Sequence, residues 1–139
     1  INFQQLRLHV SDFIRTVVKY EYFFLLDDDI VISTEDVNRL FSMMREYQLK
    51  IAQPSLVMSY YTYKHTAFHP FYILRYTNFV EMMMPCFSRD ALKAVLPTFE
   101  QKIRWCGIEM HWPVLVGSNH KDMAIVDAVS AKHTRPVQS

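Results

Sequence analysis

Three consecutive aspartates, Asp27 to Asp29, form the strongest chemical signal in the sequence. They follow the apolar run YFFLL at residues 22–26, which is too short for a helix and is typical of a buried β-strand. Because side chains alternate along a strand, Asp27 and Asp29 are expected on one side and Asp28 on the other. Two carboxylates at this spacing suit Mg²⁺ or Mn²⁺, which bridge proteins to phosphate oxygens. The alternative is that the acids only cap a loop or the next helix.

Two glutamates are candidates for contact with a substrate. Glu109 follows Gly107 at an expected helix start, where the helix dipole favours an ionised carboxylate that could act as a general base. It could equally be an ordinary first-turn glutamate. Glu81 lies in the apolar segment FVEMMM, expected to be a strand, where an unpaired carboxylate is costly to bury. It therefore needs a partner, either Arg75 or Arg104 in an ion pair or a hydroxyl group of a ligand.

Aromatic side chains are concentrated in residues 59–79 and at Trp105 and Trp112. Such rings can stack on sugar faces, although they also serve as ordinary packing. We take Trp105 as the candidate among them for substrate contact.

The elements expected around these residues predict an α/β fold with a largely parallel mixed sheet flanked by helices. If residues 22–26 form a strand buried on both faces of a parallel sheet, the aspartates lie at its carboxyl end. Ligands bind at that edge in open α/β sheets. Ser33 and Asp36 form a capping box for a helix that is expected to run to about Leu49.

Other patterns predict the remaining elements. The expected elements are a helix over residues 3–17, a strand over 50–58 broken at Pro54, a long loop with a hairpin-like arm over 59–79, a strand over 78–87, a short helix capped by Ser88 and stopped by Pro97, a turn feeding a helix kinked near Pro113, and a strand over 123–129.

Composition limits the class of protein. The 139 residues are half apolar and carry a net charge of +1, which favours one domain over residues 1–139 and argues against a nucleic-acid groove. No apolar run approaches the roughly 20 residues that span a bilayer, and no signal peptide is visible, so we expect a soluble cytoplasmic protein. Cys86 and Cys106 are expected to be buried thiols. A first residue that is not Met, together with only two glycines, indicates a fragment of a longer chain.

Five segments resemble, in the same order, the blocks of an uncharacterised group of proteins related to the GT-A glycosyltransferases. They are FFLLDDDI, QPSL, FVEMMMPCFSRDAL, WCGIEMHWP and IVDAVSAKHTRP, and together they span residues 22 to 136. The resemblance implies the carboxyl-terminal portion of a GT-A-like fold. It also implies transfer of a sugar from a nucleotide-sugar donor to a glycan or other hydroxyl acceptor, with a divalent ion on the D-x-D motif.

The resemblance further implies a role for each candidate residue. Asp29 would be the direct metal ligand, Asp27 would lie near the ribose or sugar, and His133 would add an imidazole ligand that favours Mn²⁺. Arg135 would meet the leaving diphosphate or face water. We accordingly assign Asp27, Asp29 and His133 to the metal, Asp27, Asp28 and Arg135 to the donor, Glu109 to catalysis, and Glu81 and Trp105 to the substrate. The motif GIEMH lacks the paired acids of many relatives, which leaves the inverting mechanism open.

Two other functions fit parts of the sequence. In a phosphatase of the haloacid dehalogenase type, Asp27 would be the nucleophile and Asp29 the acid/base, although no downstream acid pair follows in a suitable strand. A transferase remnant that binds a glycan or a partner without catalysis is the other possibility. The sequence leaves the donor, the acceptor, the stereochemical course and the oligomeric state undetermined.

Overall fold

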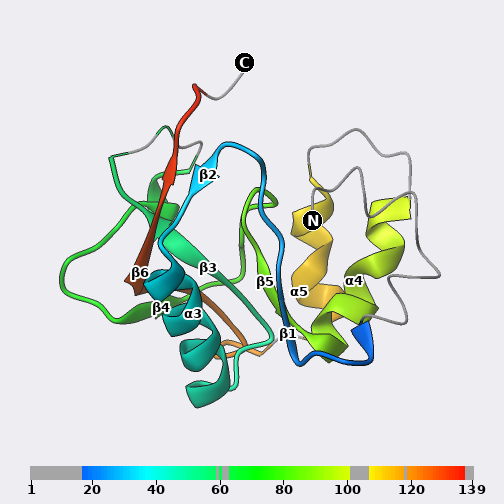
Figure 1. Ribbon diagram of the computed structural model, residues 1–139. Helices are drawn as coiled ribbons and strands as arrows, with labels where there is room; N and C mark the ends of the chain where they lie inside the picture. Colours follow the sequence, from blue (N-terminus) through cyan, green and yellow to red (C-terminus); the bar gives the residue numbers. More distant parts are fainter. Residues whose placement is uncertain (1–16, 59, 61–62, 101–106, 118, 137–139) are drawn as a thin grey trace.

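The protein has an α/β fold in which a mixed six-stranded sheet carries helices on both faces (Figure 1). This computed structural model describes residues 17–58, 60, 63–100, 107–117 and 119–136. The helix expected over residues 3–17 therefore lies almost entirely outside the described residues, as do Arg104, Trp105 and Cys106. The elements in chain order are β1 (Tyr22–Phe24), β2 (Ile30–Val31), α3 (Thr34–Glu46), β3 (Ile51–Leu56), η1 (Lys64–Thr66), β4 (Leu74–Tyr76), β5 (Cys86–Ser88), α4 (Arg89–Glu100), η2 (Ile108–His111), α5 (Trp112–Leu115) and β6 (Met123–His133).

The sheet is mixed, but the prediction that it is largely parallel is wrong. Its order is β1-β5-β3-β6-β2, with β4 also paired to β6. Among the described strands, β3 and β6 pair in parallel, whereas the other pairings are antiparallel. The run at residues 22–26 does form a strand, yet β1 pairs with β5 at the sheet edge and its side chains are only half-buried. An edge strand lacks the second neighbour that a central parallel strand would have.

The core is divided between the two faces of the sheet. Ile51, Phe87 and Met123 pack against α4 and α5, while their strand neighbours Ala52 and Ala124 pack against α3. This split follows from the alternation of side chains along each strand. Figure 1 shows α3 on one side of the sheet and α4 with α5 on the other. The buried thiol of Cys86 belongs to the α3 side.

Helix α3 begins where the sequence predicts. The Ser33 hydroxyl accepts a hydrogen bond from the Asp36 amide at 3.0 Å, which satisfies one of the free N–H groups of the first turn. The helix ends at Glu46, and Gln48 then takes a positive φ of 51° before β3 begins. Fully buried Leu40 and Met44 attach the helix to the sheet.

Neither proline interrupts its element. Strand β3 runs through Pro54, and the irregularity appears instead as a shift in its register with β6, from Pro54 opposite Val126 to Ser55 opposite Ser130. Helix α4 likewise continues through Pro97 to Glu100. Core packing of its other residues offsets the one backbone bond that Pro97 cannot make.

Three further predicted boundaries are wrong. The expected loop over 59–79 contains β4, which pairs with β6 rather than forming a hairpin arm. The strand expected over 78–87 is reduced to β5, so Glu81 lies in a loop. Pro113 lies in the first turn of α5, after the 3₁₀ turn η2, and so helps begin a helix rather than kinking one. No helix in the described ranges is long and apolar enough to cross a membrane.

A buried ion pair occupies the bulge of β6. Residues 127–129 lie between the two registers of β6, and the Asp127 side chain there is fully buried. Arg75 on β4 meets it with Nε at 2.7 Å and Nη2 at 2.9 Å, and the His69 amide donates to the same carboxylate at 2.8 Å. Arg75 also donates to the carbonyls of His65 and Ala67, both at 2.7 Å. One guanidinium therefore joins β4, β6, η1 and the residue that follows η1.

Replacing Asp127 with alanine should lower the free energy of unfolding by about 3 kcal/mol, because Arg75 and the His69 amide would lose a buried acceptor. Chemical denaturation measures the change. Glu21→Ala is the matched control, since the Arg45–Glu21 pair is long at 3.7 Å and both side chains are largely exposed. It should change stability little. Equal effects of the two substitutions would contradict a central role for the buried pair.

Candidate functional site

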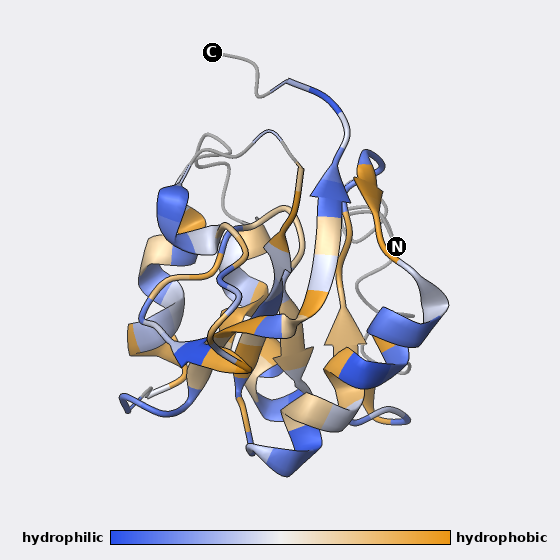
Figure 2. Ribbon diagram, turned by 90° about the vertical axis from the view of Figure 1, so that its left-hand side faces the viewer, coloured by the Kyte–Doolittle hydropathy of each residue, from blue (hydrophilic) through white to orange (hydrophobic). Residues whose placement is uncertain are grey.

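The triple-aspartate turn lies against the end of β6. The chain reverses direction at Asp28 and Asp29, where the Ile30 amide donates to the Asp27 carbonyl at 3.3 Å. The Thr134 amide and hydroxyl both donate to the Asp29 carbonyl, at 2.9 and 3.0 Å. Strand β2 then pairs with the last residues of β6, and this end of β6 is hydrophilic (Figure 2). Backbone bonds thus fix together two segments that are far apart in the sequence.

The imidazole of His133 contacts the turn directly. Its Nε2 lies 3.1 Å from Asp29 Oδ2, and its Nδ1 lies 3.0 Å from the Tyr60 carbonyl oxygen. A carbonyl only accepts hydrogen bonds, so Nδ1 carries a proton, and in the neutral ring Nε2 then presents a lone pair to a carboxylate that also only accepts. That contact is satisfied by a second proton on the ring or by a cation between the two groups.

The three aspartates differ in exposure as strand alternation predicts, although a turn rather than a strand produces the pattern. Asp29 is largely buried at its side chain (16% exposed), whereas Asp28 is 72% exposed. Asp27 is partly buried, and its amide donates to the Met83 carbonyl at 2.9 Å. Burial, reinforced by the charges of Asp29 and Asp28 and opposed by His133, raises the pKa of Asp27 to about 6. The negative charges of Asp29 and Asp28 therefore affect the pKa of Asp27 more than the imidazole of His133 does.

Arg135 lies beside the exposed aspartate. Its Nη1 is 3.5 Å from Asp28 Oδ1, and both side chains are mostly exposed. The pair is weak in water, so the guanidinium can reorient towards another anion.

Glu81 is buried and has a hydroxyl partner. The Thr66 Oγ1 lies 2.6 Å from Glu81 Oε1 and 2.8 Å from the Tyr63 carbonyl oxygen. One hydroxyl proton cannot serve two acceptors, so the network is complete when Glu81 carries a proton of its own. Burial raises the pKa of Glu81, the Thr66 bond and His133 lower it, and Glu109 raises it. The expected ion pair with Arg75 does not form, because that guanidinium is bound to Asp127.

Glu109 is buried near the same group of charges. It is the second residue of the four-residue 3₁₀ turn η2, so the predicted long-helix dipole is replaced by a direct contact in which the Gly107 amide donates to Glu109 Oε2 at 3.2 Å. Gly107 has a φ of 105°, which glycine adopts without strain. Because Glu109 and His133 both act on the pKa of Glu81, all three side chains lie within charge-interaction range.

The structure thus brings together most of the predicted residues. Asp27, Asp29 and His133 form one group, and Glu81 with Glu109 forms a second group that interacts with His133. Among the described residues, no three His, Cys, Asp or Glu side chains already stand in a geometry that could hold a metal ion. A site that used Asp27 together with Asp29 and His133 would require the Asp27 side chain to turn towards that pair. Trp105 lies outside the described residues.

Sequence analysis missed the polar residues that support this site. Gln53 and Ser55 are fully buried on β3, and Gln53 Oε1 accepts from the Glu81 amide at 2.6 Å. Two polar side chains inside a core strand were an available signal, since buried polar groups need specific partners. The Tyr60 carbonyl carried no such signal, because a backbone group can be assigned only once the chain is folded.

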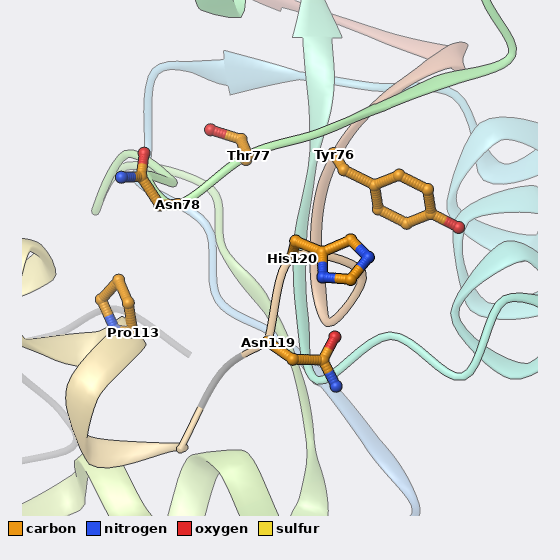
Figure 3. A pocket seen from close by; sticks show the side chains of 6 residues that line it. All are labelled: Tyr76, Thr77, Asn78, Pro113, Asn119 and His120. Carbon is orange, nitrogen blue, oxygen red and sulfur yellow. The ribbon is translucent and has the colours of Figure 1, made fainter.

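A separate surface pocket lies at the opposite end of β6. Its volume is about 460 Å³. It is lined by Tyr76, Thr77, Asn78, Pro113, Asn119 and His120 (Figure 3). These residues come from the end of β4, from α5 and from the turn that precedes β6. The lining carries no carboxylate, so the pocket lacks the chemistry of the aspartate turn.

The wild type should lose stability relative to the Glu81→Gln variant as the pH rises. The folded-state pKa of Glu81 is raised, so the carboxyl group stabilises the fold below its unfolded-state pKa, and this contribution is lost as the pH rises through the folded-state value. Urea denaturation of both proteins between pH 4 and pH 8 measures the difference. Glu21→Gln, at a largely exposed side chain, should show no such trend. A pH-independent difference for Glu81→Gln would contradict the assignment of a buried, protonated carboxyl.

Comparisons with known proteins support the fold without naming an activity. The model of a family of unknown function, DUF707, matches residues 8–70, which include the three aspartates but cover less than half of the chain. A crystal structure of A197 from STIV matches with a TM-score of 0.53 and 14% identity, covering 94% of this chain and 66% of that one. No curated protein matches the sequence. The chain is therefore similar in fold to A197, of which it spans just under two thirds.

Proposed function

We propose that this chain is part of a metal-dependent glycosyltransferase that moves a sugar from a nucleotide-sugar donor to an acceptor hydroxyl. The observation that carries the proposal is the contact between His133 Nε2 and Asp29 Oδ2, with the other ring nitrogen held by the Tyr60 carbonyl. Metal-ligating histidines commonly donate their second N–H to a carbonyl in this way, which orients the lone pair of the ligating nitrogen.

The donor set fits a divalent ion. Asp29 and His133 already face each other, and Asp27 lies close enough for its pKa to respond to both. Carboxylate and imidazole together suit Mn²⁺ better than ions that prefer oxygen alone. The bound ion would supply positive charge to the leaving nucleotide diphosphate. Arg135, weakly paired and exposed, is placed to add a second positive charge to that group.

In the proposed reaction, Glu109 accepts a proton from the acceptor. The acceptor oxygen forms a bond to the anomeric carbon of the donor sugar. The bond from that carbon to the diphosphate breaks, and its electron pair leaves with the diphosphate. The hydroxyl proton passes to a carboxylate oxygen of Glu109, while the Glu81 oxygen that does not face Thr66 would accept a hydrogen bond from another hydroxyl of the acceptor.

Asp29→Asn should weaken Mn²⁺-dependent binding of UDP or GDP at least tenfold, because it removes charge from the residue that faces His133. Asp28→Asn is the matched control, since its side chain is 72% exposed and is paired with Arg135. It should weaken binding much less. Isothermal titration calorimetry with and without Mn²⁺ measures both effects. Equal losses, or nucleotide binding that does not need Mn²⁺, would overturn the metal assignment.

Glu109→Gln should slow transfer by about 10²- to 10⁴-fold while leaving nucleotide affinity unchanged, because it removes the proton acceptor but keeps the shape of the side chain. Release of nucleotide diphosphate in the presence of acceptor measures the rate. Glu46→Gln, exposed at the end of α3, should behave as wild type. Hydrolysis of p-nitrophenyl phosphate without sugar transfer would instead support the phosphatase alternative.

A further inference from the structure

Residues 68–73, which connect η1 to β4, hold several apolar side chains in solvent. Their sequence is FHPFYI, and we call them the apolar loop. Phe71 is 86% exposed, Ile73 58% and Tyr72 53%. Figure 1 shows the green segment that leads into β4 at the left edge of the molecule, well separated from α5. Adjacent exposed apolar side chains of this kind commonly mark a binding surface.

The fold fixes the apolar loop at both ends. The Phe68 amide donates to the Leu56 carbonyl of β3 at 2.9 Å, and the Ile73 carbonyl accepts from the Ala128 amide of β6 at 2.8 Å. The loop is therefore anchored to two central strands. Its exposed side chains are held away from the core before any partner arrives, which lowers the entropic cost of binding.

The backbone N–H groups of residues 68–72 all bond inside the protein, and the proline at position 70 has none to satisfy. The His69 amide donates to the buried Asp127 carboxylate at 2.8 Å. The Phe71 amide reaches His69 Nδ1 and the Tyr72 amide reaches the His69 carbonyl oxygen, each at 3.4 Å. Lipid chains offer no hydrogen bonds, so a loop that enters a bilayer interface must satisfy its own amides in this way.

Basic side chains lie on both sides of the apolar loop. The sequence from residue 57 to residue 80 contains no Asp or Glu. Lys64 of η1 is exposed, and Arg39 of α3, one turn after Glu35, is exposed and donates to the β6 residue that holds the end of the loop. The acid that contacts the loop, Asp127, is fully buried in its ion pair. The apolar side chains are thus flanked by positive charge.

We propose that the apolar loop docks the protein on the surface of an anionic lipid bilayer, with Phe71, Tyr72 and Ile73 inserted at headgroup depth. The ring of Phe71 and the side chain of Ile73 supply apolar contact, while the Tyr72 hydroxyl remains in the wet layer. Lys64 and Arg39 face the anionic headgroups. A protein that paired with the loop could supply acceptors of its own, so it would not require the amides to be satisfied in advance.

A tryptophan reporter tests the insertion directly. Phe71→Trp and Val114→Trp place an indole at two positions of nearly equal exposure, 86% and 83%, and Val114 lies on α5. The full chain, without metal or nucleotide, is mixed with vesicles of phosphatidylcholine alone or with phosphatidylserine added. Relative to the wild type, the emission of Phe71→Trp should shift to shorter wavelength with the mixed vesicles. The emission of Val114→Trp should not shift.

Vesicle cosedimentation measures the affinity. Phe71→Ser should weaken binding to mixed vesicles about tenfold, because it removes the most exposed apolar side chain of the loop. Val114→Ser should bind as the wild type does, and Tyr72→Ser is a second loop variant should Phe71→Ser not fold. Binding of the wild type to phosphatidylcholine alone should be about fivefold weaker than to mixed vesicles.

Failure of the wild type to bind mixed vesicles would refute the lipid assignment, as would equal losses in Phe71→Ser and Val114→Ser. Self-association of the wild type that Phe71→Ser abolishes in analytical ultracentrifugation, without vesicle binding, would make the loop a protein interface instead. Docking does not depend on the proposed transferase activity, which is tested separately by the calorimetric titrations.

Discussion

The change of register between β3 and β6 is the constraint on which the rest of the structure depends. Pro54 has no N–H to donate, and beyond it the partner of β3 shifts from Val126 to Ser130. The residues skipped on β6 include Asp127, whose carboxylate is buried in the bulge and binds Arg75. Bulges commonly redirect a strand next to a functional site. Here the strand resumes beyond the bulge and ends at His133.

Strand β6 connects the parts of the candidate site. Its first half, from Met123 to Val126, is buried core between the helices. Through Arg75, the bulge holds the carbonyls of His65 and Ala67. The last residue of β6, His133, contacts Asp29, and β2 pairs alongside that end of the strand. A disturbance at Asp127 would therefore reach both η1 and the contact between His133 and Asp29, although neither contains that residue.

The candidate site, unlike the apolar core, contains several buried or partly buried acidic side chains. Burial raises the pKa of both Asp27 and Glu81, and the neighbouring acids add to the shift, Asp29 and Asp28 at Asp27 and Glu109 at Glu81. Natural proteins retain such unfavourable charge where it serves binding or catalysis. A divalent ion would offset repulsion between the aspartates, whereas Glu81 has a raised pKa and the Thr66 hydroxyl as its partner. The two groups of acids thus differ in the partners available to them.

The sequence by itself determined the local elements and the candidate chemistry. The Ser33 cap, the strand before the aspartates and the start of α4 all follow from neighbours within a few residues. Tertiary structure decided what local patterns cannot encode. The antiparallel pairing of β1, the Arg75–Asp127 pair and the contact of the Tyr60 carbonyl with His133 each join segments that are distant in the sequence. The passage of β3 and α4 through their prolines depends on the packing of the surrounding core. The summed packing energy of the domain outweighs the helix and strand preferences of single residues. These contacts therefore exist only once the chain has folded.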